Sequence, residues 1–158
     1  MGIARAADNP GLWATVNICD TARLPDSMGI RASMPGNGAD QRMWMRFTAE
    51  YWSRGRQGWT AVSGLGVSPW VYAGSAQYAR RQAGWTFAFS APPEGVAFTM
   101  RAHVEFEWRA KSVSTARRAA KRSRGRVVRS VIRTTETGIE GVDGGDPPGT
   151  SKAACLIY

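Results

Sequence analysis

The residues best suited to chemistry are ten lysines and arginines between Arg109 and Arg133, a stretch that contains no aspartate or glutamate. Outside it, 11 basic residues face 12 acidic ones, so the net charge of +9 is a local feature. Such a stretch attracts anionic polymers with an affinity that falls as salt rises. The residues predicted to bind a polyanion are Arg117, Arg118, Lys121, Arg122 and Arg124. A solvated loop that only aids solubility is the competing interpretation.

Seven tryptophans form the second group of candidate binding residues. Trp44 and Trp52 fall on the polar face of an alternating segment, and with Trp59 and Trp70 they could make a platform on which sugar rings stack. The alternative is that a loop or second sheet covers this face. Trp13, Trp85 and Trp108 are assigned to the core.

Carboxylates and the single histidine give little support for catalysis. Glu105 and Glu107 share one strand face at about 7 Å, a separation found in inverting glycosidases. Two such glutamates more often pair with arginines on an exposed face. His103 lies beside Arg101 and Glu105, which predicts a solvated ladder of ion pairs. We therefore expect no enzymatic activity.

Neither a cofactor nor a metal is predicted. The glycine-rich segment Gly64–Trp70 has no following helix, so it does not match a phosphate-binding loop. Glu140, Asp143 and Asp146 lack the ligand spacing of an EF-hand, which favours an acidic turn without an ion. The two cysteines lie in no CxxC or Cys/His cluster.

Cys19 and Cys155 each sit in a short apolar run near one end of the chain. A disulfide between the first and last strands is one interpretation, and it would indicate an oxidising compartment. Two buried free thiols are the other.

Alternation of apolar and polar residues is the dominant pattern. From Val96 to Arg109 every second residue is apolar, and the segment from Arg42 to Trp52 alternates in the same way. Turn signals rich in glycine and proline separate the segments. The predicted strands are Trp13–Cys19, Met28–Met34, Arg42–Trp52, Trp59–Ser63, Trp70–Ala73, Gln77–Arg81, Trp85–Ser90, Val96–Arg109, Arg126–Thr135 and Lys152–Ile157.

Many short strands without a long helical period predict an all-β fold, an antiparallel immunoglobulin-like β-sandwich in which the label describes architecture only. Lys111–Arg124 is predicted to be a mobile basic loop between two strands, which the resemblance given below implies is inserted, and Gly138–Thr150 a long turn. We expect residues 10–158 to form one domain and residues 1–9 to be a disordered or trimmed leader remnant, because Ala4-Arg5-Ala6 is similar to a signal-peptide end.

Five segments together resemble an uncharacterised family of predicted secreted proteins from GC-rich actinobacteria. They are Trp13–Thr21, Met28–Gly36, Ser68–Phe89, Phe106–Arg109 and Gly145–Cys155. The resemblance implies export, an immunoglobulin-like β-sandwich and pairing of Cys19 with Cys155. It implies no catalytic residues. The family is expected to have a shorter turn where this chain has Lys111–Arg124.

The sequence thus predicts an exported, non-catalytic binding domain at or near the cell envelope that engages an anionic polymer through its basic loop. Nucleic acid is disfavoured as the polymer because the loop has no interleaved aromatic residue for base stacking. The alternatives are a carbohydrate-binding module using Trp44, Trp52 and Trp59, or a structural subunit that assembles through strand edges. No apolar run reaches the ~20 residues of a membrane-spanning helix.

Overall fold

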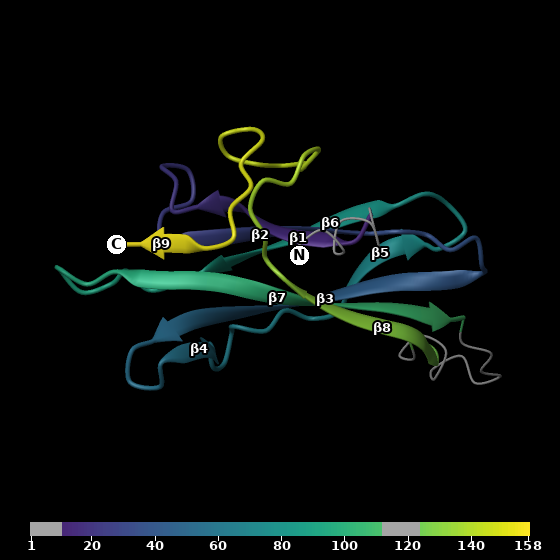
Figure 1. Ribbon diagram of the computed structural model, residues 1–158, viewed down its shortest axis with the longest axis horizontal. Helices are drawn as coiled ribbons and strands as arrows, with labels where there is room; N and C mark the ends of the chain where they lie inside the picture. Colours follow the sequence, from purple (N-terminus) through teal and green to yellow (C-terminus); the bar gives the residue numbers. More distant parts are fainter. Residues whose placement is uncertain (1–10, 112–123) are drawn as a thin grey trace, which may run out of the picture.

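The computed structural model describes residues 11–111 and 124–158. Within these ranges the chain forms two antiparallel sheets that face each other, as Figure 1 shows. The predicted antiparallel β-sandwich is therefore confirmed. The strands are β1 (Trp13–Cys19), β2 (Ser27–Met34), β3 (Gln41–Ser53), β4 (Gly58–Ala61), β5 (Val71–Ser75), β6 (Arg81–Ala88), β7 (Phe98–Ala110), β8 (Val127–Thr134) and β9 (Cys155–Ile157).

The smaller sheet has the order β1-β2-β6, and the larger has the order β4-β3-β7-β8. In the larger sheet β5 also pairs with β3, and β9 also pairs with β7. The long central pair runs from Gln41 opposite Ala110 to Tyr51 opposite Met100. The side chains on the outer face of this β3–β7 pair make up most of the candidate site described below.

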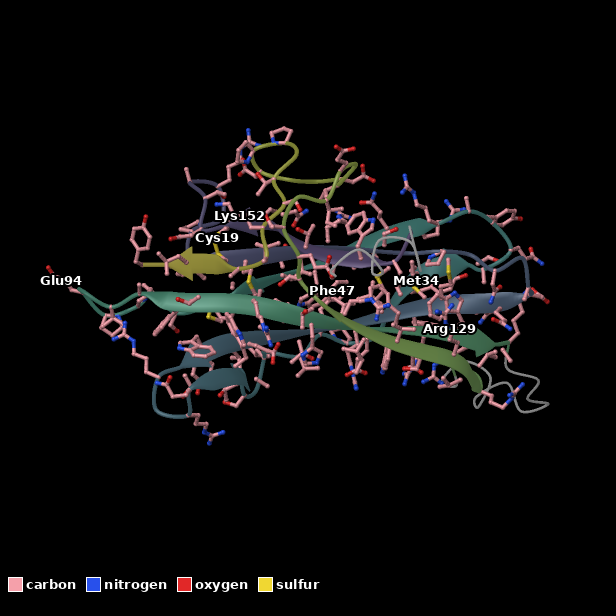
Figure 2. The ribbon with its side chains drawn as sticks, in the orientation of Figure 1. Cys19, Met34, Phe47, Glu94, Arg129 and Lys152 are labelled. Carbon is pink, nitrogen blue, oxygen red and sulfur yellow. A yellow bond between two sulfur atoms is a disulfide. The ribbon has the colours of Figure 1, made fainter. Side chains whose placement is uncertain are left out.

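Alternation along β3 and β7 decides which side chains enter the core. Met45 lies opposite Phe106 and Phe47 opposite Val104, and all four are fully buried between the sheets. Figure 2 shows Phe47 in this layer. Burial of a large apolar side chain contributes about 1.5–3 kcal/mol, so these rows fix the register of the pair. As predicted, Trp108 lies in this core and Trp85 packs against it, whereas Trp13 is buried but does not belong to the same cluster.

The structure corrects one predicted strand and shortens others. Gln77–Arg81 is wrong as a strand, because the chain turns here and β6 begins only at Arg81. The backbone of Ala76 accepts hydrogen bonds from the amides of Asn37 and Gly38, which anchors this turn. The last strand begins at Cys155, since Lys152 pairs with Val16 of the other sheet.

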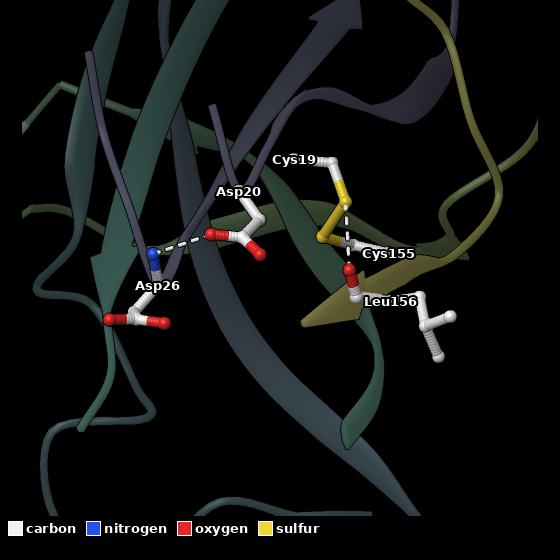
Figure 3. The surroundings of a disulfide bond; sticks show 5 residues. All are labelled: Cys19, Asp20, Asp26, Cys155 and Leu156. Atoms are coloured by element: carbon white, nitrogen blue, oxygen red, sulfur yellow. Dashed lines mark hydrogen bonds between the residues drawn. A yellow bond between two sulfur atoms is a disulfide. The ribbon is translucent and has the colours of Figure 1, made fainter. Parts of the chain in front are cut away.

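A disulfide joins Cys19 of β1 to Cys155 of β9, with a Cα–Cα distance of 5.5 Å (Figure 3). The predicted pairing is confirmed, and it links the first strand of one sheet to the last strand of the other. Next to it, the Asp20 carboxylate accepts a hydrogen bond of 2.8 Å from the Asp26 amide and closes the β1–β2 turn. The bridge therefore holds the two sheets together at this end.

The covering segment, residues 138–153, lies over the outer face of the smaller sheet, where Figure 1 shows it in yellow and yellow-green. The Asp143 carbonyl accepts hydrogen bonds of 3.0 Å from both Asn17 Nδ2 and Arg31 Nε. Gln82 Nε2 donates to the Gly141 carbonyl at 2.8 Å. The predicted acidic turn is thus held mainly by its backbone. Among the described residues, no cluster of three His, Cys, Asp or Glu could hold a metal ion.

No helix in residues 11–111 and 124–158 is long and apolar enough to cross a membrane.

Candidate functional site

Charged side chains form a ladder on the outer face of the larger sheet. Arg46 Nη2 lies 2.9 Å from Glu105 Oε2 across the β3–β7 pair. Further along, Arg101 Nε lies 3.1 Å and His103 Nδ1 3.5 Å from the same oxygen, Glu50 Oε1. The predicted ladder around His103 is present, and its carboxylate partner is Glu50 of the neighbouring strand.

Both glutamates considered for acid–base chemistry are ion-paired. Glu105 pairs with Arg46, and Glu107 pairs with Arg109 at 2.6 Å. The side chain of Glu107 is buried, so its partner arginine compensates a charge removed from water. Both carboxylates meet arginines as expected, but the expected exposed face is wrong for Glu107, which is buried and pairs with Arg109 of its own strand.

An arginine cluster surrounds Trp70 on this face. The guanidinium carbons of Arg46, Arg124 and Arg109 lie 4.7, 5.1 and 5.7 Å from the centre of the Trp70 ring. Arg46 comes from β3, Arg109 from the end of β7, and Arg124 from the chain leading into β8. Each distance is within the range of cation–π attraction. We call these four residues the Trp70 cluster.

Positive charge exceeds negative charge in the Trp70 cluster. Three guanidinium groups meet only two carboxylates, those of Glu105 and Glu107. Arg124 has no carboxylate partner among the described residues. Burial lowers the pKa of Arg124, the nearby Arg109 lowers it further, Glu107 raises it, and Arg46 lowers it. A bound anion would offset this repulsion.

Hydrogen-bonding capacity is also unused in the cluster. The Nε atoms of Arg46, Arg109 and Arg124 are buried and lack an acceptor. Arg109 does donate from Nη1 to the Gly125 carbonyl, which joins β7 to the start of the segment before β8. Unsatisfied buried donors are uncommon in proteins and call for an explanation. Stacking against the indole accounts for part of their stabilisation, and an anion at the outer guanidinium nitrogens would add to it.

Of the predicted polyanion-binding residues, only Arg124 is described, and it belongs to the Trp70 cluster. The other four, Arg117, Arg118, Lys121 and Arg122, lie outside the described residues. Sequence reasoning missed Arg46, whose signal was its place on the polar face of β3. It named Trp70 as part of a sugar-stacking platform but did not predict that arginines would surround this ring.

The predicted tryptophan platform is divided into two separate aromatic pairs. Trp52 and Trp59 pack edge to face with ring centres 5.6 Å apart. Trp44 packs instead against Tyr72 at 5.1 Å. Trp44 and Trp52 are eight residues apart on one strand, or about 26 Å. The three residues therefore do not form one continuous surface.

A pocket of about 300 Å³ lies beside the Trp70 cluster, lined by Arg42, Trp44 and Tyr72. Arg42 stands directly opposite Arg109 in the β3–β7 register, which places the pocket next to the arginines. Arg42 has no carboxylate partner within 4 Å among the described residues. Aromatic and positively charged side chains therefore line one concave site.

A second hollow of about 300 Å³ lies at one end of the sandwich and is apolar. Tyr51, Val62, Phe89, Phe98 and Met100 line it together with Ser90. The smaller sheet has three strands and the larger six, so part of the larger sheet's inner face extends past its neighbour. Of the residues that the structure describes, those lining this hollow carry no charge.

Strand β8 is the outermost strand at its edge of the larger sheet, which bears on assembly through strand edges. Val127, Val128 and Ile132 are exposed along it. The register shifts between Trp108 and Arg109, and β8 carries two arginines. A bulge and charges are the devices by which sheets limit edge pairing. Assembly through this edge stays a prediction.

Comparisons of the chain with protein-family models, with curated proteins and with solved structures found no match.

Proposed function

We propose that this chain is an exported, non-catalytic binding domain that engages an anionic polymer at or near the cell envelope. The polymer contacts the Trp70 cluster and the basic segment that continues from Arg124, which contains Arg117, Arg118, Lys121 and Arg122. The immunoglobulin-like sandwich serves as a rigid support for this surface.

The excess of positive charge in the Trp70 cluster is the observation that carries the proposal. Three guanidiniums from separate parts of the chain meet around one indole with only two carboxylates. Repulsion among like charges costs free energy unless an anion compensates it. The acid-free sequence that precedes Arg124 extends the same charge beyond the cluster.

The disulfide supports the export part of the proposal. Structural disulfides persist in oxidising environments and are rare where thiols are kept reduced. The Cys19–Cys155 bridge therefore fits an extracellular location.

The test measures binding of the disulfide-bonded chain to long-chain polyphosphate at several salt concentrations. If about five phosphate contacts form, affinity falls about a hundredfold between ~50 and ~200 mM salt. Replacing Arg117, Arg118, Lys121, Arg122 and Arg124 by Gln should weaken binding strongly and remove most of this dependence, leaving the contribution of Arg46 and Arg109. A matched control removes the same charge at exposed positions elsewhere. It replaces Arg23, Arg54, Arg56, Arg80 and Lys152 by Gln.

Loss of binding in the first variant with retention in the second supports the proposal. Equal loss in both variants would show that binding follows net charge alone, and the proposed surface would be wrong. Absence of binding by the unmodified chain at low salt would overturn the function itself.

A further inference from the structure

We infer that the pocket formed by Arg42, Trp44 and Tyr72 recognises an acidic sugar unit, so that the anionic polymer is a polysaccharide that carries carboxylates. This inference rests on the proposed function and names its ligand class. The sugar ring lies against the aromatic pair, and its carboxylate lies at the Arg42 guanidinium.

A bulge in the β3–β5 pairing builds the aromatic side of the pocket. Met43 pairs with Gly74 and Trp44 pairs with Tyr72, so Ala73 is an extra residue on β5. Gly74 takes a φ of +135°, a conformation that L side chains rarely adopt. Bulges redirect side chains. Here Tyr72 comes to lie opposite Trp44, and the two rings pack at 5.1 Å with a tilt of 56°.

The tilted rings leave aromatic surface available to a ligand. Tyr72 is 51% exposed. Trp44 is only partly exposed, because β3 is paired on both sides at this residue, with β5 and with β7. The faces of aromatic rings are electron-rich and attract weakly positive hydrogens. Sugar rings present such C–H groups on their flat faces, while a phosphate chain has none. The aromatic pair therefore favours a sugar over an inorganic polyanion.

The charged side of the pocket requires an anion. Arg42 and Arg109 are directly opposite each other on neighbouring strands, and like charges in this arrangement destabilise a sheet. Arg109 has Glu107 as its partner, whereas Arg42 has no carboxylate among the described residues. A carboxylate forms two parallel hydrogen bonds with a guanidinium. A neutral sugar would leave this charge uncompensated.

The size of the pocket suits a single sugar unit. Its volume of about 300 Å³ is at the lower end of the range of about 300–1,000 Å³ for small-molecule sites. The Trp70 cluster next to it would meet the carboxylate of an adjoining unit. A repeating acidic polysaccharide satisfies both neighbouring sites with one chemistry.

The experiment compares three probes on the disulfide-bonded chain: tetragalacturonate, maltotetraose and polyphosphate. Tyr72→Ala should weaken tetragalacturonate binding about tenfold, which corresponds to about 1.4 kcal/mol, because the sugar ring loses its aromatic contact. The same variant should leave polyphosphate binding within about twofold, because Tyr72 lies outside the Trp70 cluster. Tyr158→Ala is the matched control, because this exposed tyrosine follows β9 at the opposite end of β7 from Arg42.

Arg42→Gln provides an independent variant, because this side chain is exposed and its loss should not affect folding. It should weaken tetragalacturonate binding and leave the thermal midpoint unchanged. Arg54→Gln, an exposed change just after the far end of β3, should leave both the binding and the thermal midpoint unchanged. Tyr72→Trp should restore binding lost in Tyr72→Ala.

The outcomes separate the two proposals. If polyphosphate binds and tetragalacturonate does not, or if Tyr72→Ala and Arg42→Gln leave tetragalacturonate binding unchanged, the sugar-acid inference is wrong and the proposed function stands. Equal binding of maltotetraose would contradict the role of Arg42. If no anionic probe binds, the proposed function fails and the inference with it.

Discussion

The two outer faces of this sandwich both carry arginine side chains, but the groups that contact these arginines differ between the faces. On the smaller sheet, the covering segment lies over Asn17 and Arg31 and satisfies both through the Asp143 carbonyl. On the larger sheet, Arg46, Arg109 and Arg124 gather around Trp70, and positive charge exceeds negative charge. Arg31 is thus bonded to a backbone carbonyl of the covering segment, whereas the three arginines of the larger sheet share one indole and two carboxylates.

Glycine explains part of this difference. Gly144 in the covering segment has a φ of +70°, and a Cβ there would lie 2.6 Å from Arg31 Nη2. Glycine favours this backbone conformation, and a Cβ here would displace the end of the Arg31 side chain. On the larger sheet, the indole of Trp70 lies against Arg46.

The largest expected effect comes from removing the disulfide that joins β1 to β9, just after the covering segment. The bridge closes a loop between residues 136 positions apart, and chain-entropy arguments give about 5 kcal/mol for such a loop. Cys19→Ser with Cys155→Ser should lower the free energy of unfolding by about 2–5 kcal/mol in urea titrations. The oxidised chain before and after reduction is the control. A decrease in the free energy of unfolding below about 1 kcal/mol would mean that the hydrogen bonds between the covering segment and the smaller sheet suffice without the bridge.

Thr15→Val should have an intermediate effect on the same face. Thr15 is fully buried on β1 and donates a 2.6 Å hydrogen bond to the Glu136 carbonyl, while its oxygen lies 2.6 Å from Ser151 Oγ. Valine keeps the shape and leaves the carbonyl unpaired, at a cost of about 1–3 kcal/mol. Thr134→Val on the exposed β8 is the matched control and should change stability by less than about 0.5 kcal/mol. Equal effects of the two variants on thermal unfolding would contradict a stabilising role for the buried hydrogen bond of Thr15.

The smallest effects should come from removing one arginine on each face. Arg31→Gln should cost about 1 kcal/mol of stability and leave polyphosphate binding unchanged, because Arg31 bonds to the covering segment. Arg46→Gln should cost at most about 1 kcal/mol, since its ion pair is partly exposed. It should also reduce the salt slope of polyphosphate binding by about one. If both variants change the slope equally, the contrast between the faces is wrong.

Much of the fold could be predicted because alternation of apolar residues is a local signal. The boundaries of β1 match the predicted Trp13–Cys19, and the long β3 and β7 agree within two residues. The error at Gln77–Arg81 arose because a turn held by Asn37 and Gly38 depends on contacts from a distant loop. The alternation of apolar and polar residues within Gln77–Arg81 carries no information about that contact.

Prediction of the candidate site was partial for the same reason. The basic stretch was visible in the sequence, and Arg124 at its end does lie in the Trp70 cluster. The predicted platform started from Trp44 and Trp52 on one strand face, to which Trp59 of another strand was added. A shared face fixes the side on which a residue lies but not the distance along the strand. Strand rise separates Trp44 from Trp52 by about 26 Å, so each takes a different aromatic partner.

By itself, the sequence determined the all-β class, the inward faces of the long strands and the place of the basic stretch, because these depend on period and composition. Only the tertiary structure decided that the polar Thr15 and Asn17 are buried, since the covering segment that surrounds them comes from more than 100 residues away. It also decided that Trp70 lies among three arginines from separate segments. Burial and charge balance depend on neighbours in space, which chain folding brings together.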